Sequence, residues 1–198
     1  MRYAGFWSRL CANVVDVVAL LPVYYLGTWI EGRSRTAALV VQIPLTLLFT
    51  AYVVYFHGRW GRTLGKRAAG IRVVSVAGDA ISWRQAFLRS SVDAVLTLAF
   101  AATTVVGLWR IPSEEYLTLS SWRQRMHRVA DLAPGRGVLG WANEIWFWGE
   151  LIVLLFNRRK RALHDFIAGT VVIHDPDKPR FPVLDPDRLG ILPLLDRR

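Results

Sequence analysis

The chain has almost no cysteine and shows no sequence motif of an enzyme. Its single cysteine, Cys11, lies inside an apolar segment, so no disulfide forms within the chain and no metal site rests on several cysteines. Gly-x-Ser-x-Gly and His-Glu-x-x-His motifs are absent, and the Gly65-Lys66 pair lacks the other residues of a P-loop. We therefore expect no enzymatic activity, no cofactor and no metal site.

The chain is also poor in acidic residues, with 15 Asp and Glu against 25 Lys and Arg and a formal net charge of +10. Such a surplus is typical of proteins that bind nucleic acid and also of membrane proteins. Here the basic residues cluster outside the apolar segments, and no nucleic-acid-binding motif accompanies them. We therefore expect the lipid bilayer, and no nucleic acid, as the partner of this basic chain.

Apolar sequence is abundant, since 53% of the residues are hydrophobic. A helix needs about 20 predominantly apolar residues to cross a bilayer. Four segments meet this requirement, at residues 7–29, 36–56, 87–108 and 138–156. The first is too long, and too polar in its middle, for a cleavable signal peptide. The predicted fold class is an all-α membrane protein with about four transmembrane helices.

The distribution of Lys and Arg predicts an orientation for these helices. An even number of spans places both termini on the same side of the membrane. The N-terminal residues, the loop 57–89 and the C-terminal segment together hold most of the 25 basic residues. By the positive-inside rule, both termini and this loop are cytoplasmic. We expect a multi-pass protein of the plasma membrane, in a bacterium the inner membrane.

The loops between the spans carry local structural signals. A β-branched run at 71–76 and an Ala-Gly-Asp-Ala turn at 77–80 predict a small cytoplasmic β-hairpin that returns from Ile81. A capping box at 82–85 predicts the start of the third long helix. At 119–133, apolar residues recur at helical spacing beside arginines. This pattern is typical of an interfacial helix, or of a surface helix that packs on its own protein.

The composition changes towards the C-terminus. More than half of the nine prolines follow Asp175. A segment so rich in proline favours extended chain over packed helix. We therefore divide the chain into a transmembrane domain, residues 1–173, and a Pro-rich cytoplasmic tail, residues 174–198.

Polar and charged residues inside the spans form the candidate site. Arg9, Asn13 and Asp16 are spaced by four and three residues, which places them on one face of the first helix. Asp93 and Glu150 add a carboxylate to the third and fourth spans. Ionisable groups in membrane spans are costly and often mark ion or proton pathways. Polar stripes also join helices structurally, so both interpretations stay open.

Three segments of the chain together resemble the RDD family of small integral membrane proteins. They cover residues 6–16, 61–74 and 161–172. The residues that match the family's motifs are Arg9, Asp16, Gly65, Lys66, His164, Asp165, Gly169 and Thr170. Arg9, Asp16 and Asp165 correspond to the three residues that name the family. The resemblance implies roles in transport, including cation/proton exchange, or as a membrane partner of other proteins.

Two functions of different classes follow from these observations. In ion-coupled or solute transport, Asp16, Asp93 and Glu150 carry protons or cations, and a homo-oligomer is needed because four helices make a thin pathway. In a non-catalytic membrane scaffold, the same polar stripes bind other membrane proteins. Both functions include an ion pair between Arg9 and Asp165, which lie at the same cytoplasmic rim.

Overall fold

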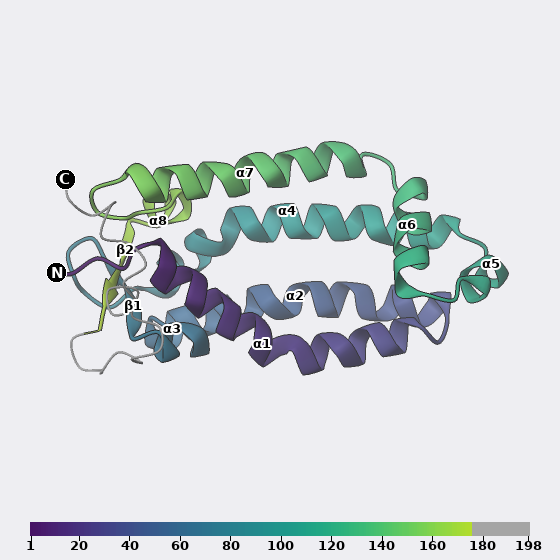
Figure 1. Cartoon of the computed structure of the whole chain (residues 1–198), viewed down its shortest axis with the longest axis horizontal. Coiled ribbons are helices and arrows are strands. Elements are labelled where there is room, and N and C mark those ends of the chain that lie inside the picture. The colour runs from purple at the N-terminus through teal and green to yellow at the C-terminus, as the bar shows by residue number, and fades with distance from the viewer. Residues whose placement is uncertain (176–198) are drawn as a thin grey trace. The chain divides into compact units, whose positions relative to one another are not determined.

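The structure is a computed structural model that describes residues 1–175, so the predicted Pro-rich tail lies outside the described residues from 176 onward. Four long helices run through the described chain: α1 (Phe6–Glu31), α2 (Arg35–Trp60), α4 (Trp83–Arg110) and α7 (Arg136–Phe156) (Figure 1). Each is long and apolar enough to cross a membrane. The four predicted spans are confirmed, and the helices begin slightly earlier than predicted.

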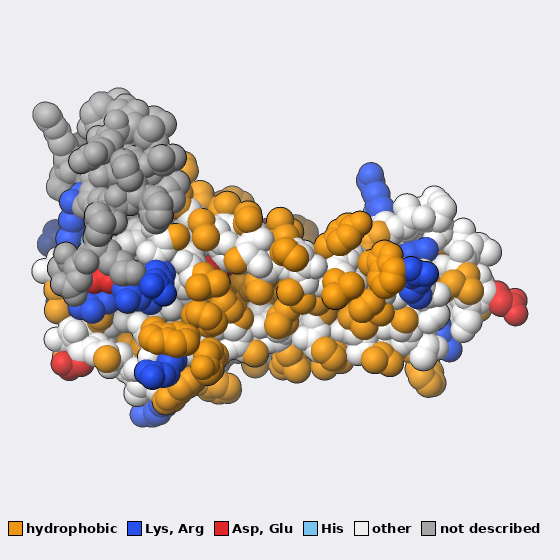
Figure 2. All heavy atoms as spheres, turned by 90° about the horizontal axis from the view of Figure 1, so that it is seen from below, with side chains coloured by type: hydrophobic (Ala, Val, Ile, Leu, Met, Phe, Trp, Pro, Cys, Tyr) orange, Lys and Arg blue, Asp and Glu red, His pale blue; other side chains and the backbone are white. Residues whose placement is uncertain are grey.

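The surfaces of these helices suit lipid rather than water. Four large apolar side chains of α7, those of Val138, Trp141, Ile145 and Phe156, are between 70% and 84% exposed. Hydrophobic side chains also cover much of the helical surface on the face drawn in Figure 2. An exposed apolar surface of this kind marks contact with a membrane or another protein. The chain is therefore an all-α membrane protein with four candidate spans.

The described chain divides into two compact units, each built from parts of the four long helices. The first unit comprises Met1–Ala19, Val53–Arg89 and the chain from Gly149 onward. The second comprises Leu20–Tyr52 and Ser90–Trp148.

A two-stranded antiparallel sheet in the first unit joins distant segments of the chain. Strand β1 (Ile71–Ser75) pairs with β2 (Thr170–His174), with Val73 opposite Val172. A small antiparallel sheet is present as predicted, but it is not the predicted hairpin of neighbouring strands, because its second strand is β2. The segment after the predicted turn adds only the isolated bridge between Val74 and Ala80. A long run of buried β-branched residues in β2 offers a larger apolar surface than this short return segment.

The segments that precede the two strands match each other in sequence and structure. Helix α3 (Leu64–Ala68) precedes β1, and α8 (Leu163–Ile167) precedes β2 (Figure 1). Residues 62–73 and 161–172 share the pattern Arg-x-Leu-x-x-x-x-Ala-Gly-x-x-Val without a gap. Both glycines of this pattern have a φ of +63°, a conformation that only glycine adopts without strain.

The matching segments belong to a larger internal repeat. Two long helices, a short helix and a strand occur in this order in each half of the described chain, and the second half has two further helices, at 113–118 and 122–132, between its long helices. Val73 and Val172 hold the same position of the repeat and lie opposite each other in the sheet. The two strands are thus related as if by a local two-fold axis. At the start of the repeat, Arg9 in α1 corresponds to Arg89 in α4, because each is followed four residues later by Asn or Asp.

The first unit has its apolar core beneath this sheet. Seven fully or almost fully buried residues form one cluster: Ala4, Ala12, Ile71, Val73, Ile81, Ala86 and Val172. They come from the N-terminal segment, α1, both strands, the residues before α4 and the first turn of α4. The predicted capping box at the start of α4 is present, since Ser82 and Gln85 each accept from the other's backbone N–H.

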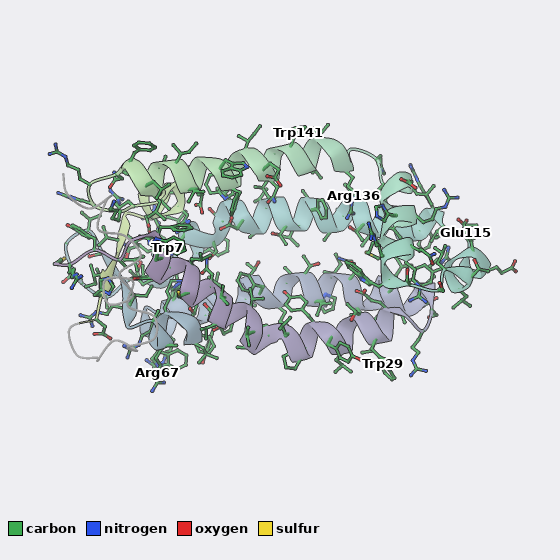
Figure 3. The ribbon with its side chains drawn as sticks, in the orientation of Figure 1. Trp7, Trp29, Arg67, Glu115, Arg136 and Trp141 are labelled. Carbon is green, nitrogen blue, oxygen red and sulfur yellow. The ribbon has the colours of Figure 1, made fainter. Side chains whose placement is uncertain are left out.

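The second unit contains α6 (Trp122–Leu132), which follows the short helix α5 (Ser113–Thr118) (Figure 1). Ser121 and Gln124 form a capping box at its start. The apolar stripe predicted for this helix packs on the protein itself: Val129 is buried in a cluster with Ala38, Leu108, Ile111 and Tyr116. Arg136, labelled in Figure 3, adds a polar contact in this unit by donating to Thr104 Oγ1 at 2.8 Å.

A substitution at Gly107 in α4 tests the packing of α6 against α4. A Cβ atom at this position would lie 2.3 Å from the carbonyl oxygen of Val129. We expect Gly107→Ala to lower the melting temperature of the purified protein, because overpacking costs roughly 1–3 kcal/mol. Gly140→Ala in α7 is the matched control, since nothing lies within 4 Å of its added Cβ. This control should gain up to about 1 kcal/mol of helix propensity. Equal melting temperatures for the two variants would contradict the described packing.

Candidate functional site

Asp165 in α8 is the centre of a buried ion-pair network. Its Oδ2 accepts from Nη1 of Arg9 at 2.7 Å, and its Oδ1 accepts from Nη1 of Arg89. All three side chains are buried. The predicted contact between Arg9 and Asp165 is confirmed. Arg89 was not among the predicted site residues, although its place in the internal repeat corresponds to that of Arg9.

The neighbours of Asp165 complete its hydrogen bonding. The backbone N–H of Ala162 donates to Oδ2 at 3.0 Å, and the hydroxyl of Thr170 donates to Oδ1 at 3.2 Å. Burial by itself would raise the pKa of Asp165, but the guanidiniums of Arg89 and Arg9 hold this pKa well below its usual range. Asp165 is therefore ionised at physiological pH and serves as a permanent counter-charge.

Asp16 holds α3 against α1. Its carboxylate accepts from Thr63 Oγ1 and from the backbone N–H of Gly65, both at 2.6 Å. Gly65 is needed for this approach, because a Cβ atom there would lie 1.9 Å from the carbonyl oxygen of Ala12. Asp16 is 2% exposed. Its contacts make it a positioning residue for the short helix.

Glu150 in α7 makes the corresponding contact with α8. Its Oε1 accepts from the backbone N–H of His164 at 3.1 Å and also contacts His164 Nδ1. His164 occupies the position of the repeat that Gly65 holds in α3. Each short helix is thus bound at the same backbone N–H by a carboxylate from a long helix. The sequence pattern identified both carboxylates, but a backbone N–H carries no side-chain signal, so their partners were missed.

Two predicted site residues do not join this network. Asn13 is exposed, so the prediction that it is buried beside Arg9 and Asp16 is wrong. The atoms of α1 that lie against Gly65 of α3 belong to the backbone of Ala12 and the side chain of Asp16. Asp93 is also exposed and lies in the second unit, where it accepts from Trp146 Nε1 at 2.8 Å.

Lys66 in α3 is a buried cation beside the network, with 8% of its surface exposed. Burial lowers the pKa of Lys66 to about 7, the guanidiniums of Arg89 and Arg9 act in the same direction, and the carboxylates of Asp16 and Asp165 oppose it. Within residues 1–175, the ammonium group of Lys66 makes no ion pair or hydrogen bond. Lys66 therefore changes its charge near neutral pH.

No group of three or more His, Cys, Asp or Glu residues in the described part of the chain could hold a metal ion.

Replacing Asp165 tests its role as a shared counter-charge. Asp165→Asn leaves two buried guanidiniums without a carboxylate, and breaking a buried ion pair costs about 3–5 kcal/mol. We expect this variant to lose most of its folded protein in membranes and in detergent. Arg9→Ala should lose less, because Arg89 still pairs with Asp165. The matched control is Asp79→Asn, at an exposed turn position. Normal yield and melting temperature for Asp165→Asn would contradict the network.

Comparison with known proteins assigns the family. The sequence model of the RDD family matches residues 3–169. The chain is 28% identical to an uncharacterized protein, YckC, of Bacillus subtilis (strain 168), over 86% of this chain and 84% of that protein. It is 22% identical to an uncharacterized membrane protein, YteJ, of the same organism, over 87% of this chain and 82% of that protein. No solved structure shows a significant match. The chain belongs to the RDD family.

Proposed function

We propose that this RDD-family membrane protein is a proton-coupled transporter of ions or small solutes, with no enzymatic activity. The observation that supports the proposal is the burial of Lys66 among charged groups, without an ion pair of its own within residues 1–175. The surrounding groups are Arg9, Arg89, Asp16 and Asp165. Uptake of a proton by Lys66 near neutral pH changes the charge of this cluster, which is the elementary step of proton coupling.

The carboxylates are poor candidates for proton coupling, because each of them already accepts hydrogen bonds in its ionised form. Asp16 and Glu150 bind the backbone of α3 and α8, and Asp165 pairs with two guanidiniums. A carboxylate that accepts several donors in its ionised form resists protonation. Lys66 has no such partner in the described chain, so its protonation can change without breaking a hydrogen bond or an ion pair of its ammonium group.

Flux measurements on Lys66 test this proposal. In liposomes that contain only this protein and a pH-sensitive dye, we expect ion gradients to drive proton movement through the wild type. Lys66→Met should abolish this movement, because methionine fills similar space without a titrating group. Arg67→Met is the matched control, since Arg67 is the adjacent cation and is exposed (Figure 3). Undiminished flux in Lys66→Met would remove Lys66 from the mechanism.

A second function, that of a non-catalytic membrane scaffold or assembly partner, is favoured by a different observation. Asp16, Glu150 and Asp165 all make contacts that hold the short helices in place. A static network of this kind stabilises a surface for other membrane proteins and needs no proton movement. The absence of flux under every imposed gradient, with wild-type protein that is folded, would favour this function over transport.

The proposal includes the plasma membrane, with both termini on the cytoplasmic side, and a homo-oligomer as the transporting form. A single chain with four spans offers a thin pathway, so the exposed apolar faces of the long helices would join copies or contact lipid. Chemical cross-linking in native membranes measures the number of copies.

Cysteine labelling tests the orientation. In a Cys11→Ala background, Ala77→Cys places a thiol in the exposed turn after β1, and Glu114→Cys places one on exposed α5. In intact cells, a membrane-impermeant thiol reagent should label the thiol at position 114 and spare the one at 77. Both thiols should react after the cells are opened. The reverse pattern in intact cells would place the first compact unit outside the cell.

A further inference from the structure

His57, in the last turn of α2, has no partner for its side chain. It is 1% exposed, and neither ring nitrogen makes a hydrogen bond within the described part of the chain. A neutral imidazole has one N–H donor and one acceptor nitrogen, and a protonated one has two donors. In either state a buried N–H group lacks an acceptor. Such a group usually marks an ion or a water that completes the site.

The charges around His57 indicate which kind of ligand fits. The groups that interact electrostatically with it are Lys66, Arg89, His164 and Asp165. Three of these are basic, and the one acid, Asp165, already accepts from two guanidiniums. A cation at this place would face like charges, and no cluster of metal-binding residues exists among residues 1–175. An acceptor with negative charge meets both the free N–H group and the surplus of basic groups.

The internal repeat explains why Lys66 lacks a carboxylate partner of its own. Lys66 holds the position of the repeat that Asp165 holds in the second copy. The equivalent residues Arg9 and Arg89 therefore share the single carboxylate of Asp165, and the first copy brings a third cation to the cluster. Asp16 is bound to α3 through Thr63 and Gly65, and Glu150 is hydrogen-bonded to His164. A protonated Lys66 thus adds a cation that forms no ion pair with any of these three carboxylates within residues 1–175.

We infer that a small monovalent anion of the chloride class binds beside His57 and Lys66 when Lys66 is protonated. Within residues 1–175, neither ring nitrogen of His57 makes a hydrogen bond, and the Lys66 ammonium makes no ion pair or hydrogen bond. Large organic anions and phospholipid headgroups do not fit this position, because His57 is only 1% exposed and Lys66 only 8% exposed. This inference stands apart from transport, since the site binds its anion whether or not the anion crosses the membrane.

Anion binding should depend on pH through Lys66. The charged or titratable groups that face Lys66 come from four elements: Arg9 and Asp16 in α1, His57 in α2, Arg89 in α4, and Asp165 in α8. Because the pKa of Lys66 is lowered to about 7, its ammonium form dominates at pH 6 and its neutral form at pH 9. Anion affinity is therefore high at pH 6 and falls as the pH rises through 7. An anion that binds only the folded state raises the melting temperature in a concentration-dependent way.

The experiment measures the thermal unfolding of the full-length protein in detergent with increasing sodium chloride, at constant ionic strength kept with sodium gluconate. At pH 6 we expect a saturable rise in melting temperature with chloride, and at pH 9 a much smaller rise. Lys66→Met should lose the chloride effect at pH 6, and the control Arg67→Met should keep it. Bromide should replace chloride and give an anomalous scattering peak beside His57 in crystals of the wild type.

Three outcomes overturn the inference. They are identical melting curves in chloride and gluconate at pH 6, a chloride effect that persists in Lys66→Met, and bromide peaks only away from His57. His57→Phe adds a second variant if Lys66→Met fails to fold, because phenylalanine fills the ring's place without a donor. Binding is measured here without any flux, so a failure of the transport proposal leaves a positive binding result intact, and the reverse also holds.

Discussion

The shared use of Asp165 by Arg9 and Arg89 is the interaction on which the first compact unit depends. One carboxylate joins α1, α4 and α8, and each of its oxygens accepts from a different guanidinium. A buried ion pair adds little net stability over an apolar replacement, but removing one partner costs about 3–5 kcal/mol. Arrangements of the helices that separate Asp165 from the two guanidiniums are therefore disfavoured. Arg9 also fixes the positions of two backbone segments, because it donates to the carbonyl oxygens of Ala4 and Lys160.

The internal repeat accounts for much of the architecture around this network. A short helix, a glycine with positive φ and a strand occur twice, and the two strands pair with equivalent valines opposite each other. The two copies even bind their short helices in the same way, through a carboxylate that accepts the N–H of Gly65 or of His164. The carboxylates come from different long helices, Asp16 from α1 and Glu150 from α7. The two copies therefore make the same kind of contact with residues at different positions.

The functional proposals rest on the place where the two copies differ most in charge. Asp165 in one copy corresponds to Lys66 in the other. The acid is ionised and fully paired, whereas the base is buried without an ion pair within residues 1–175 and titrates near neutral pH. A symmetric pair of acids would have balanced the two guanidiniums. In both proposals, the replacement of one acid by lysine leaves a cluster whose charge responds to protons and, with His57 beside it, to a small anion.

The sequence by itself determined the membrane class, the four spans and the start of α4, because apolar length and a capping box are local properties of the chain. It also predicted the contact between Arg9 and Asp165. The strand that pairs with β1 and the exposure of Asn13 were decided only by tertiary structure. Both depend on which distant segment of the chain lies against a given surface. Strand β1 pairs with the distant β2 and not with the nearer segment after its turn. In α1, Gly65 approaches the backbone of Ala12, while the neighbouring Asn13 stays exposed. The partners of Asp16 and Glu150 are backbone N–H groups, which every residue except proline carries, so only the fold could reveal which of them each carboxylate binds.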